Sequence, residues 1–91
     1  MFELVRTTSF ERRLERFMRR RPALRPRLAR VLRDLASDPF QPHLELHALA
    51  GELEGLHAVR ITYAYRLIVS LNLSEQEIIL LSIGSHDEVY R

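Results

Sequence analysis

The sequence predicts an α+β fold, in which an N-terminal strand and a helical hairpin pack on a mainly antiparallel four-stranded sheet. Apolar residues recur at helical spacing through residues 10–35 and then alternate with a period of two between residues 56 and 83. Prolines at positions 39 and 42 mark the change from one pattern to the other. The expected order of elements is therefore strand, helix, helix and three further strands.

The composition is that of one small globular domain. Of the 91 residues, 46% are hydrophobic and 29% are charged, which is ordinary for a chain that folds around one core. The sequence shows no internal repeat, linker or low-complexity tract. We therefore expect a single domain over residues 1–91.

Several classes of protein are excluded or disfavoured. Without cysteine, the chain cannot form disulfides, Cys-ligated zinc sites or iron–sulfur clusters. The four histidines are scattered and do not outline a zinc site, so we expect neither a metal nor a cofactor. No apolar run approaches the roughly 20 residues that span a bilayer, and no signal peptide is recognisable. We expect a cytoplasmic protein with no membrane contact.

The first strand and the first helix are predicted from the N-terminal residues. Residues 2–6 have the composition of a short strand, and Thr7, Thr8 or Ser9 can cap a helix that begins near Phe10. Arginines fill the faces that the apolar stripe leaves open. The stripe consists of Phe10, Leu14, Phe17 and Met18.

A second helix follows and completes a hairpin. Arg21-Pro22 ends the first helix, because proline disfavours helical geometry in the residue before it. Pro26 fits the second helix only near its first turn, which leaves the start open by several residues. The segment 38–42, Asp-Pro-Phe-Gln-Pro, ends it. Its apolar stripe is Leu24, Leu28, Val31, Leu32 and Leu35.

Three strands are expected in the C-terminal half. Residues 56–62 and 65–71 alternate in polarity, and the short link at 62–64 suggests a hairpin between them. The run 78–83 is apolar on both faces, which is typical of a central strand covered by helices. We expect Gly84 to end that strand.

Four segments in this order resemble the RelE/ParE superfamily of bacterial toxins, and within it the RelE- and YafQ-like branch. They are the basic helical hairpin, the His-x-Leu-x-Gly motif at 47–51, the hairpin of the strands around 59–61 and 65–69, and the tail 83–91 with its Gly-Ser-His-x-x-x-Tyr motif. The resemblance covers essentially the whole chain. It implies the toxin of a type II toxin–antitoxin pair.

The resemblance also implies an activity and its partners. Toxins of this branch cleave messenger RNA in the ribosomal A site without a metal, and a cognate antitoxin protein holds them inactive. Such cleavage needs one group to take the proton of the 2′-OH, a second to protonate the departing 5′-oxygen, and cations beside the phosphate. The expected partners are therefore the antitoxin, mRNA and the ribosome with its ribosomal RNA.

The resemblance places two histidines at catalytic positions. His86 follows the last strand and is our first candidate for the general acid or base, because imidazole exchanges protons near neutral pH. His47 opens the His-x-Leu-x-Gly motif, and the two could divide the acid and base roles. The alternative is that His86 only ends a strand and that His47 only packs a loop.

Two arginines are expected to hold the phosphate. Arg60 and Arg66 flank the hairpin turn, and a turn with an odd number of residues would place them opposite each other on one face. Like charges in that position destabilise a sheet unless an anion lies between them. Because guanidinium stays protonated, clamping is a better role for them than proton transfer. Alternatively each pairs with an acid such as Glu54 or Glu77.

Further residues are expected to contact RNA. Tyr90, four residues after His86, could stack on a base or join the proton relay, and Tyr65 is a weaker stacking candidate. For both, simple packing is the alternative. Residues 1–40 hold eleven arginines and five acids, whereas 41–91 hold three and seven, so the cationic surface belongs to the helical hairpin. Its candidate RNA-binding residues are Arg12, Arg13, Arg16, Arg19, Arg20 and Arg27.

One departure from the family pattern keeps two other functions open. Many active members have an arginine two residues before the terminal glycine, where this chain has Ser82. Losing a phosphate-stabilising cation lowers a rate by roughly 10²-fold. Either Arg66 takes over this role, or the nuclease is weak. The alternatives are a ParE-like toxin that binds DNA gyrase and a degenerate homologue that only binds its antitoxin.

Overall fold

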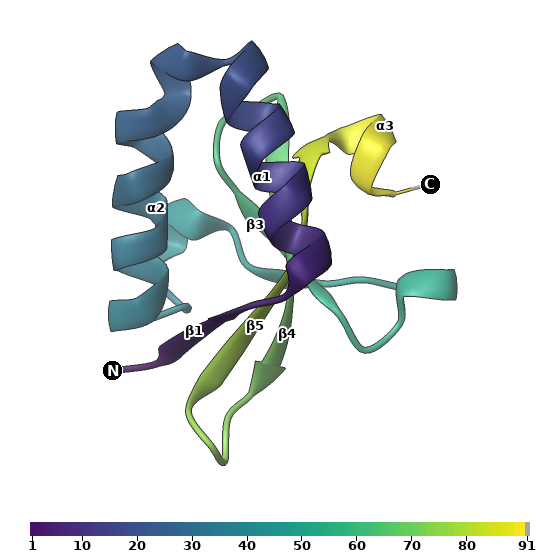
Figure 1. The fold of residues 1–91 in the computed structure, drawn as a ribbon. Helices are drawn as coiled ribbons and strands as arrows, with labels where there is room; N and C mark the ends of the chain where they lie inside the picture. Colours follow the sequence, from purple (N-terminus) through teal and green to yellow (C-terminus); the bar gives the residue numbers. More distant parts are fainter. Residues whose placement is uncertain (91) are drawn as a thin grey trace.

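The structure is a computed structural model that describes residues 1–90, so Arg91 at the end of the tail segment lies outside it. Figure 1 shows the strands packed beside a pair of helices, with a third, short helix near the C-terminus. The elements in chain order are β1 (Glu3–Arg6), α1 (Thr8–Arg20), α2 (Arg25–Ser37), β2 (His47–Ala48), β3 (His57–Arg60), β4 (Tyr65–Asn72), β5 (Glu77–Ser85) and α3 (His86–Val89). Short 3₁₀ turns are η1 (Pro22–Leu24), η2 (Pro42–Leu44) and η3 (Gly51–Leu53).

The sheet confirms the predicted α+β class but has five strands instead of four. Its order is β1-β5-β4-β3-β2. Only β1 and β5 pair in parallel, and the other three pairs are antiparallel. The unpredicted strand is β2, in which His47 pairs with Ala58 and Ala48 with His57. Two residues are too few to show an alternating pattern in a sequence.

The helical hairpin lies along one face of the sheet (Figure 1). Helix α1 begins at Thr8, two residues before the predicted start, because the side-chain oxygen of Thr7 accepts a hydrogen bond from the Phe10 N–H and caps it. Pro26 lies in the first turn of α2, as predicted.

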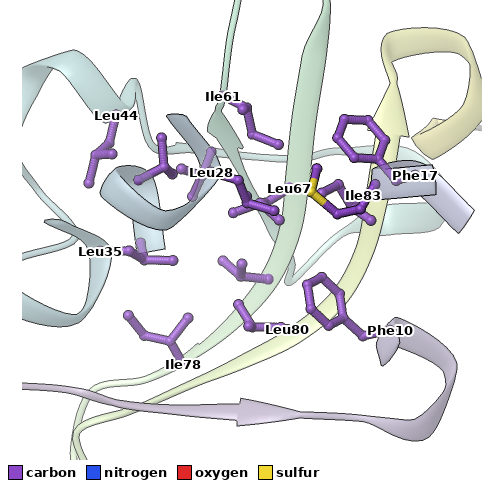
Figure 2. Close-up of a cluster of buried hydrophobic side chains, with 14 residues drawn as sticks. Phe10, Phe17, Leu28, Leu35, Leu44, Ile61, Leu67, Ile78, Leu80 and Ile83 are labelled. Carbon is purple, nitrogen blue, oxygen red and sulfur yellow. The ribbon is translucent and has the colours of Figure 1, made fainter. Parts of the chain in front are cut away.

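The main core lies between the hairpin and the sheet. Figure 2 shows its 14 buried side chains, with Phe10 and Phe17 from α1 and Leu28 and Leu35 from α2 directed toward the strands. Phe10 and Leu35 are 0% exposed. Burying one such side chain stabilises the fold by about 1.5–3 kcal/mol. Leu44 from η2 also belongs to this core and was not predicted.

Strand β5 lies between β1 and β4 and contacts α1, which confirms the predicted covered central strand. The prediction that Gly84 ends it is wrong. The strand continues to Ser85, with Gly84 opposite Arg66 and Ser85 opposite Tyr65. It ends where the Ser85 side chain caps α3.

A smaller cluster covers the opposite face of the sheet. Ala58, Ile68 and Val89 are buried there, so α3 packs against the side of the sheet that the hairpin leaves free. Gly84 allows this approach. A Cβ at Gly84 would lie 3.2 Å from the Glu88 Cβ and 3.4 Å from a Val89 methyl.

A helix that crosses a membrane must be long and apolar. Among residues 1–90, no helix combines the length and the apolarity that crossing a bilayer requires.

Candidate functional site

Helix α3 brings His86 and Tyr90 together. Their spacing of four residues places one side chain above the other on a helical turn, and their ring centroids lie 4.3 Å apart at 71°. His86 is exposed, with Nδ1 3.7 Å from an Asp87 carboxylate oxygen. Both rings line a hollow of about 400 Å³. The other lining residues are Leu49, Ala50, Glu52 and Leu53.

A capping box holds α3 in place. The Ser85 N–H donates to the Glu88 carboxylate, and the Glu88 N–H donates to the Ser85 hydroxyl. These hydrogen bonds with Ser85, together with the guanidiniums of Arg21 and Arg20, lower the pKa of Glu88. The charged carboxylate therefore keeps the first turn of the helix capped.

Cross-strand pairing places the other catalytic candidates on the α3 face of the sheet. His47 lies opposite Ala58, and Arg60 lies opposite Arg66. Residues directly opposite each other share a face, as do residues two apart on one strand. Since Ala58 belongs to the cluster under α3, all three candidates face that side. The predicted opposition of Arg60 and Arg66 is confirmed.

His47 lies apart from His86. Strands β3 and β4 separate β2 from β5, which corresponds to roughly 14 Å at the usual spacing of about 4.8 Å. His47 is exposed, and its Nδ1 lies 2.9 Å from the Glu45 carbonyl oxygen. A carbonyl can only accept, so Nδ1 carries the proton and Nε2 is the free acceptor in neutral imidazole. This tautomer can act as a base.

The two arginine side chains take different partners. The Arg60 guanidinium lies 3.0 Å from the Glu45 carboxylate, whereas Arg66 donates to the carbonyls of Thr62 and Tyr65 in the hairpin turn. The sequence suggested Glu54 or Glu77 as acidic partners, and neither is used. Each guanidinium has five N–H donors, so both keep donors for a phosphate without forming a closed clamp.

Glu45 is a functional candidate that the sequence prediction missed. Its carboxylate binds Arg60 and its carbonyl binds His47, so it connects two predicted residues. Its φ of 47° lies in the left-handed region, which non-glycine residues rarely adopt. The only sequence signal was an acid two residues before the His-x-Leu-x-Gly motif.

Tyr65 packs on the hairpin side of the sheet. Its ring meets Phe17 edge-on, with centroids 5.2 Å apart, and the Arg21 guanidinium lies 4.6 Å above it. Adjacent strand residues point to opposite faces, so Tyr65 faces away from Arg66. The Arg21 guanidinium therefore already occupies one face of this ring.

The predicted RNA-binding arginines divide into separate groups. Arg13, Arg16 and Arg20 line a hollow of about 50 Å³ beside Gly84, together with Arg21, which was not predicted. Arg12 lines a neighbouring hollow with Arg13 and Arg16. The remaining two have partners elsewhere: Arg19 pairs with Glu15 at 2.7 Å and Arg27 donates to the Ile61 carbonyl at 3.3 Å.

Arg13 also reaches the position of the family departure. Its guanidinium donates to the Ser82 hydroxyl at 3.3 Å. A cation from α1 therefore lies where the resemblance would place a strand arginine.

Two of the four histidines are not scattered but lie close together in the sequence. His43 and His47 are four residues apart, a spacing that brings two ligands together on a helix. Here η2 ends at Leu44, and the His43 Nε2 instead lies 2.8 Å from an Asp34 carboxylate oxygen. Among the residues that the structure describes, no three His, Asp or Glu side chains gather closely enough to hold a metal ion.

The arrangement of a basic helical hairpin on a mainly antiparallel sheet, with a short C-terminal helix on its other face, is the RelE-like toxin fold. No protein-family model matches the sequence, and no curated protein sequence matches it. Solved structures, however, do match the chain. YafQ from E. coli aligns over 100% of both chains, with a TM-score of 0.82 and 13% identity.

Two further structures extend this likeness. The YoeB/ParE toxin from Agrobacterium tumefaciens has a TM-score of 0.76 at 22% identity, over 93% of this chain and 99% of its own. The toxin–antitoxin complex RelBE2 from Mycobacterium tuberculosis matches with a TM-score of 0.66 at 23% identity, over 93% of this chain and 98% of that chain. The chain therefore has the fold of the RelE/ParE toxins.

Proposed function

We propose that the chain is the toxin of a type II toxin–antitoxin pair and an endoribonuclease that cleaves mRNA without a metal. One observation carries this proposal. His86 and Tyr90 line a hollow on the sheet face that also presents His47, Arg60 and Arg66. Acid–base groups, a stacking ring and phosphate-binding cations thus share one surface, in the fold of known toxins.

The hollow beside α3 suits a nucleobase. Its volume of about 400 Å³ lies within the range of roughly 300–1,000 Å³ that small-molecule pockets occupy. Leu49 and Leu53 give it an apolar wall, and Tyr90 offers a ring on which an unpaired base can stack. A base held there would bring its sugar and phosphate close to His86.

The cleavage reaction then uses groups of this face. A base removes the 2′-OH proton, the 2′-oxygen forms a bond to phosphorus, and the bond from phosphorus to the 5′-oxygen breaks. An acid protonates the departing 5′-oxygen, which leaves a 2′,3′-cyclic phosphate and a 5′-hydroxyl. His86 acts at the base pocket. His47 can accept a proton at Nε2, but because β3 and β4 separate it from β5, it is the alternative site of proton transfer and not the partner of His86 at the same phosphate. Arg60 and Arg66 stabilise the phosphate charge.

Two faces of the protein account for the expected partners. The arginines of the helical hairpin would follow ribosomal RNA while mRNA enters the α3 face. An antitoxin would be an acidic or amphipathic segment, and the M. tuberculosis neighbour was solved as a toxin–antitoxin complex. We expect this partner to bury Arg60, Arg66 or the helical hairpin. We expect the complex to form in the cytoplasm. A complex that leaves all of them exposed would refute this.

A ParE-like function is the second candidate, and three observations favour it. Arg60 and Arg66 both have internal partners, and Ser82 replaces a family arginine. The Agrobacterium neighbour carries both names, YoeB and ParE. Such a toxin would inhibit DNA gyrase by binding and would leave RNA intact.

The test is cleavage of a translated mRNA by the purified protein, with ribosomes and EDTA present. We expect metal-independent cuts that His86→Ala reduces by roughly 10²–10⁴-fold, the usual contribution of a general acid or base, with His47→Ala tested in parallel. Glu75→Gln is the control, because this side chain is exposed in the β4–β5 turn, away from α3. Gyrase inhibition by a folded protein that leaves mRNA uncut would replace this proposal with the second candidate.

A further inference from the structure

A second hollow lies on the hairpin side of Arg60, where α2, η2 and the end of β3 meet. Its volume is about 170 Å³, and it contains neither His86 nor Tyr90. Its lining residues are Arg27, Arg30, Val31, Asp34, His43, Arg60 and Ile61.

The charges around this hollow are mostly positive. Arg27 and Arg30 are three residues apart on α2 and therefore lie on one helix face, and Arg60 joins them from β3. Arg27 is anchored there by its hydrogen bond to the Ile61 carbonyl, at 3.3 Å. The one lining carboxylate is Asp34, and its oxygen already lies 2.8 Å from the His43 Nε2.

Arg27 and Arg30 gather positive charge around the hollow, together with Arg60, which shares its charge with the Glu45 carboxylate at 3.0 Å. Such a cluster of cations creates a favourable position for an anion. Guanidinium forks match the oxygens of a phosphate, to which they donate pairs of parallel hydrogen bonds. A volume of about 170 Å³ leaves room for a phosphate with a few water molecules, each of which occupies roughly 30 Å³ in the liquid. The lining holds no Phe, Tyr or Trp ring on which a base could stack.

Arg60 makes this hollow continuous with the α3 face. It lies opposite Arg66 on the neighbouring strand, about 5 Å away at the Cα atoms, and it is also one of the residues that line the second hollow. Successive phosphates of an RNA strand could therefore contact Arg66 and then the second hollow. We propose that Arg27 and Arg30 bind the backbone phosphate of the substrate RNA next to the one that is cut, with Arg60 shared between the two phosphates, an inference that rests on the proposed function.

The test measures binding separately from cleavage. A short, labelled 2′-O-methyl RNA cannot be cut, and its affinity is followed by fluorescence anisotropy across a salt series. For single strands, each phosphate contact contributes about 0.7 to the slope of log K against log salt. Arg30→Ala should lower this slope by about 0.7. Arg33→Ala removes an exposed arginine of α2 outside the hollow and should leave the slope unchanged.

A second variant should increase the affinity for RNA, a result that misfolding cannot produce. Asp34→Asn removes the carboxylate from the lining and should tighten RNA binding several-fold, whereas Glu75→Gln, in the exposed β4–β5 turn, should not. Equal slopes for Arg30→Ala and Arg33→Ala, or no gain with Asp34→Asn, would overturn the proposal, as would a wild-type protein that does not bind the RNA.

The results separate the two proposals. If mRNA is cleaved and the Arg30→Ala slope equals that of the wild type, the subsite proposal is refuted and the nuclease proposal stands. If Arg30→Ala specifically lowers the slope in a protein that never cuts mRNA, the hollow still binds an RNA phosphate but the nuclease proposal is refuted.

Discussion

Replacing Gly84 by alanine should impair the α3 face while leaving the rest of the fold intact. The new Cβ would lie 3.2 Å from both the Cβ and a carboxylate oxygen of Glu88, and 3.4 Å from a Val89 methyl. The first two separations are tighter than ordinary packing, so α3 must move outward by a few tenths of an ångström. His86 and Tyr90 would move with it.

The expected energy is comparable with what holds α3. A single helical turn is not stable alone. It is held by the Ser85 cap, typically about 1 kcal/mol, and by burial of Val89, which is 6% exposed and contributes about 1.5–3 kcal/mol. Overpacking of this kind costs roughly 1–3 kcal/mol. The turn should therefore be displaced or partly released. Since a displacement of about 1 Å can cost 10²-fold in rate, we expect cleavage to fall roughly 10–100-fold.

The assay combines cleavage rates with urea unfolding and the ring-current shift of the His86 protons beside Tyr90. The control is Gly55→Ala. Its φ of 92° makes a side chain strained, but a Cβ there meets nothing within 4 Å, so it should lower stability without affecting α3. A Gly84→Ala protein that keeps wild-type cleavage and the His86 shift would refute this account of α3.

Three further predictions concern the core, the cap and Glu45. Leu35→Ala should lower the free energy of unfolding by about 2–5 kcal/mol, because the side chain is 0% exposed; a urea titration showing less than about 1 kcal/mol would contradict the core assignment. The pKa of Glu88 is lowered in the folded state, chiefly by hydrogen bonds with Ser85. The charged carboxylate therefore stabilises the fold fully at pH values above 4.5, the ordinary pKa of this group, and this stabilisation is lost as the pH falls through the pKa of the folded state. The stability difference between wild type and Glu88→Gln should therefore shrink on acidification, and a difference independent of pH would exclude the charged cap. Glu45→Gln removes a half-exposed ion pair with Arg60 that is worth about 0–1 kcal/mol; freeing Arg60 should tighten RNA binding up to about five-fold in an anisotropy titration, and weaker binding would show that Glu45 does not compete with RNA.

Most of the fold could be predicted because its signals are local. Helical spacing defined both helices, proline chemistry defined their ends, and alternation defined β3 and β4. The missing strand, β2, depends on pairing with Ala58 and His57, which no local pattern encodes. Gly84 was taken as a strand end, whereas its role is to let α3 approach β5.

The candidate site was predictable only in part, for a related reason. The tail motif indicated His86 and Tyr90, and the odd turn length placed Arg60 opposite Arg66, but side-chain partners come from distant segments. Glu45 meets Arg60 across 15 positions, and Arg13 meets Ser82 across 69. The acidic partners proposed from the sequence were therefore wrong, and the connecting role of Glu45 was not predicted.

The most direct test of the nuclease proposal is the chemistry of the cut ends. mRNA cleaved on ribosomes with EDTA present should carry a 2′,3′-cyclic phosphate on the upstream fragment and a 5′-hydroxyl on the downstream one, and His86→Ala should abolish both. Fragments with a 3′-hydroxyl and a 5′-phosphate, or cuts that require a divalent metal, would contradict attack by the 2′-oxygen.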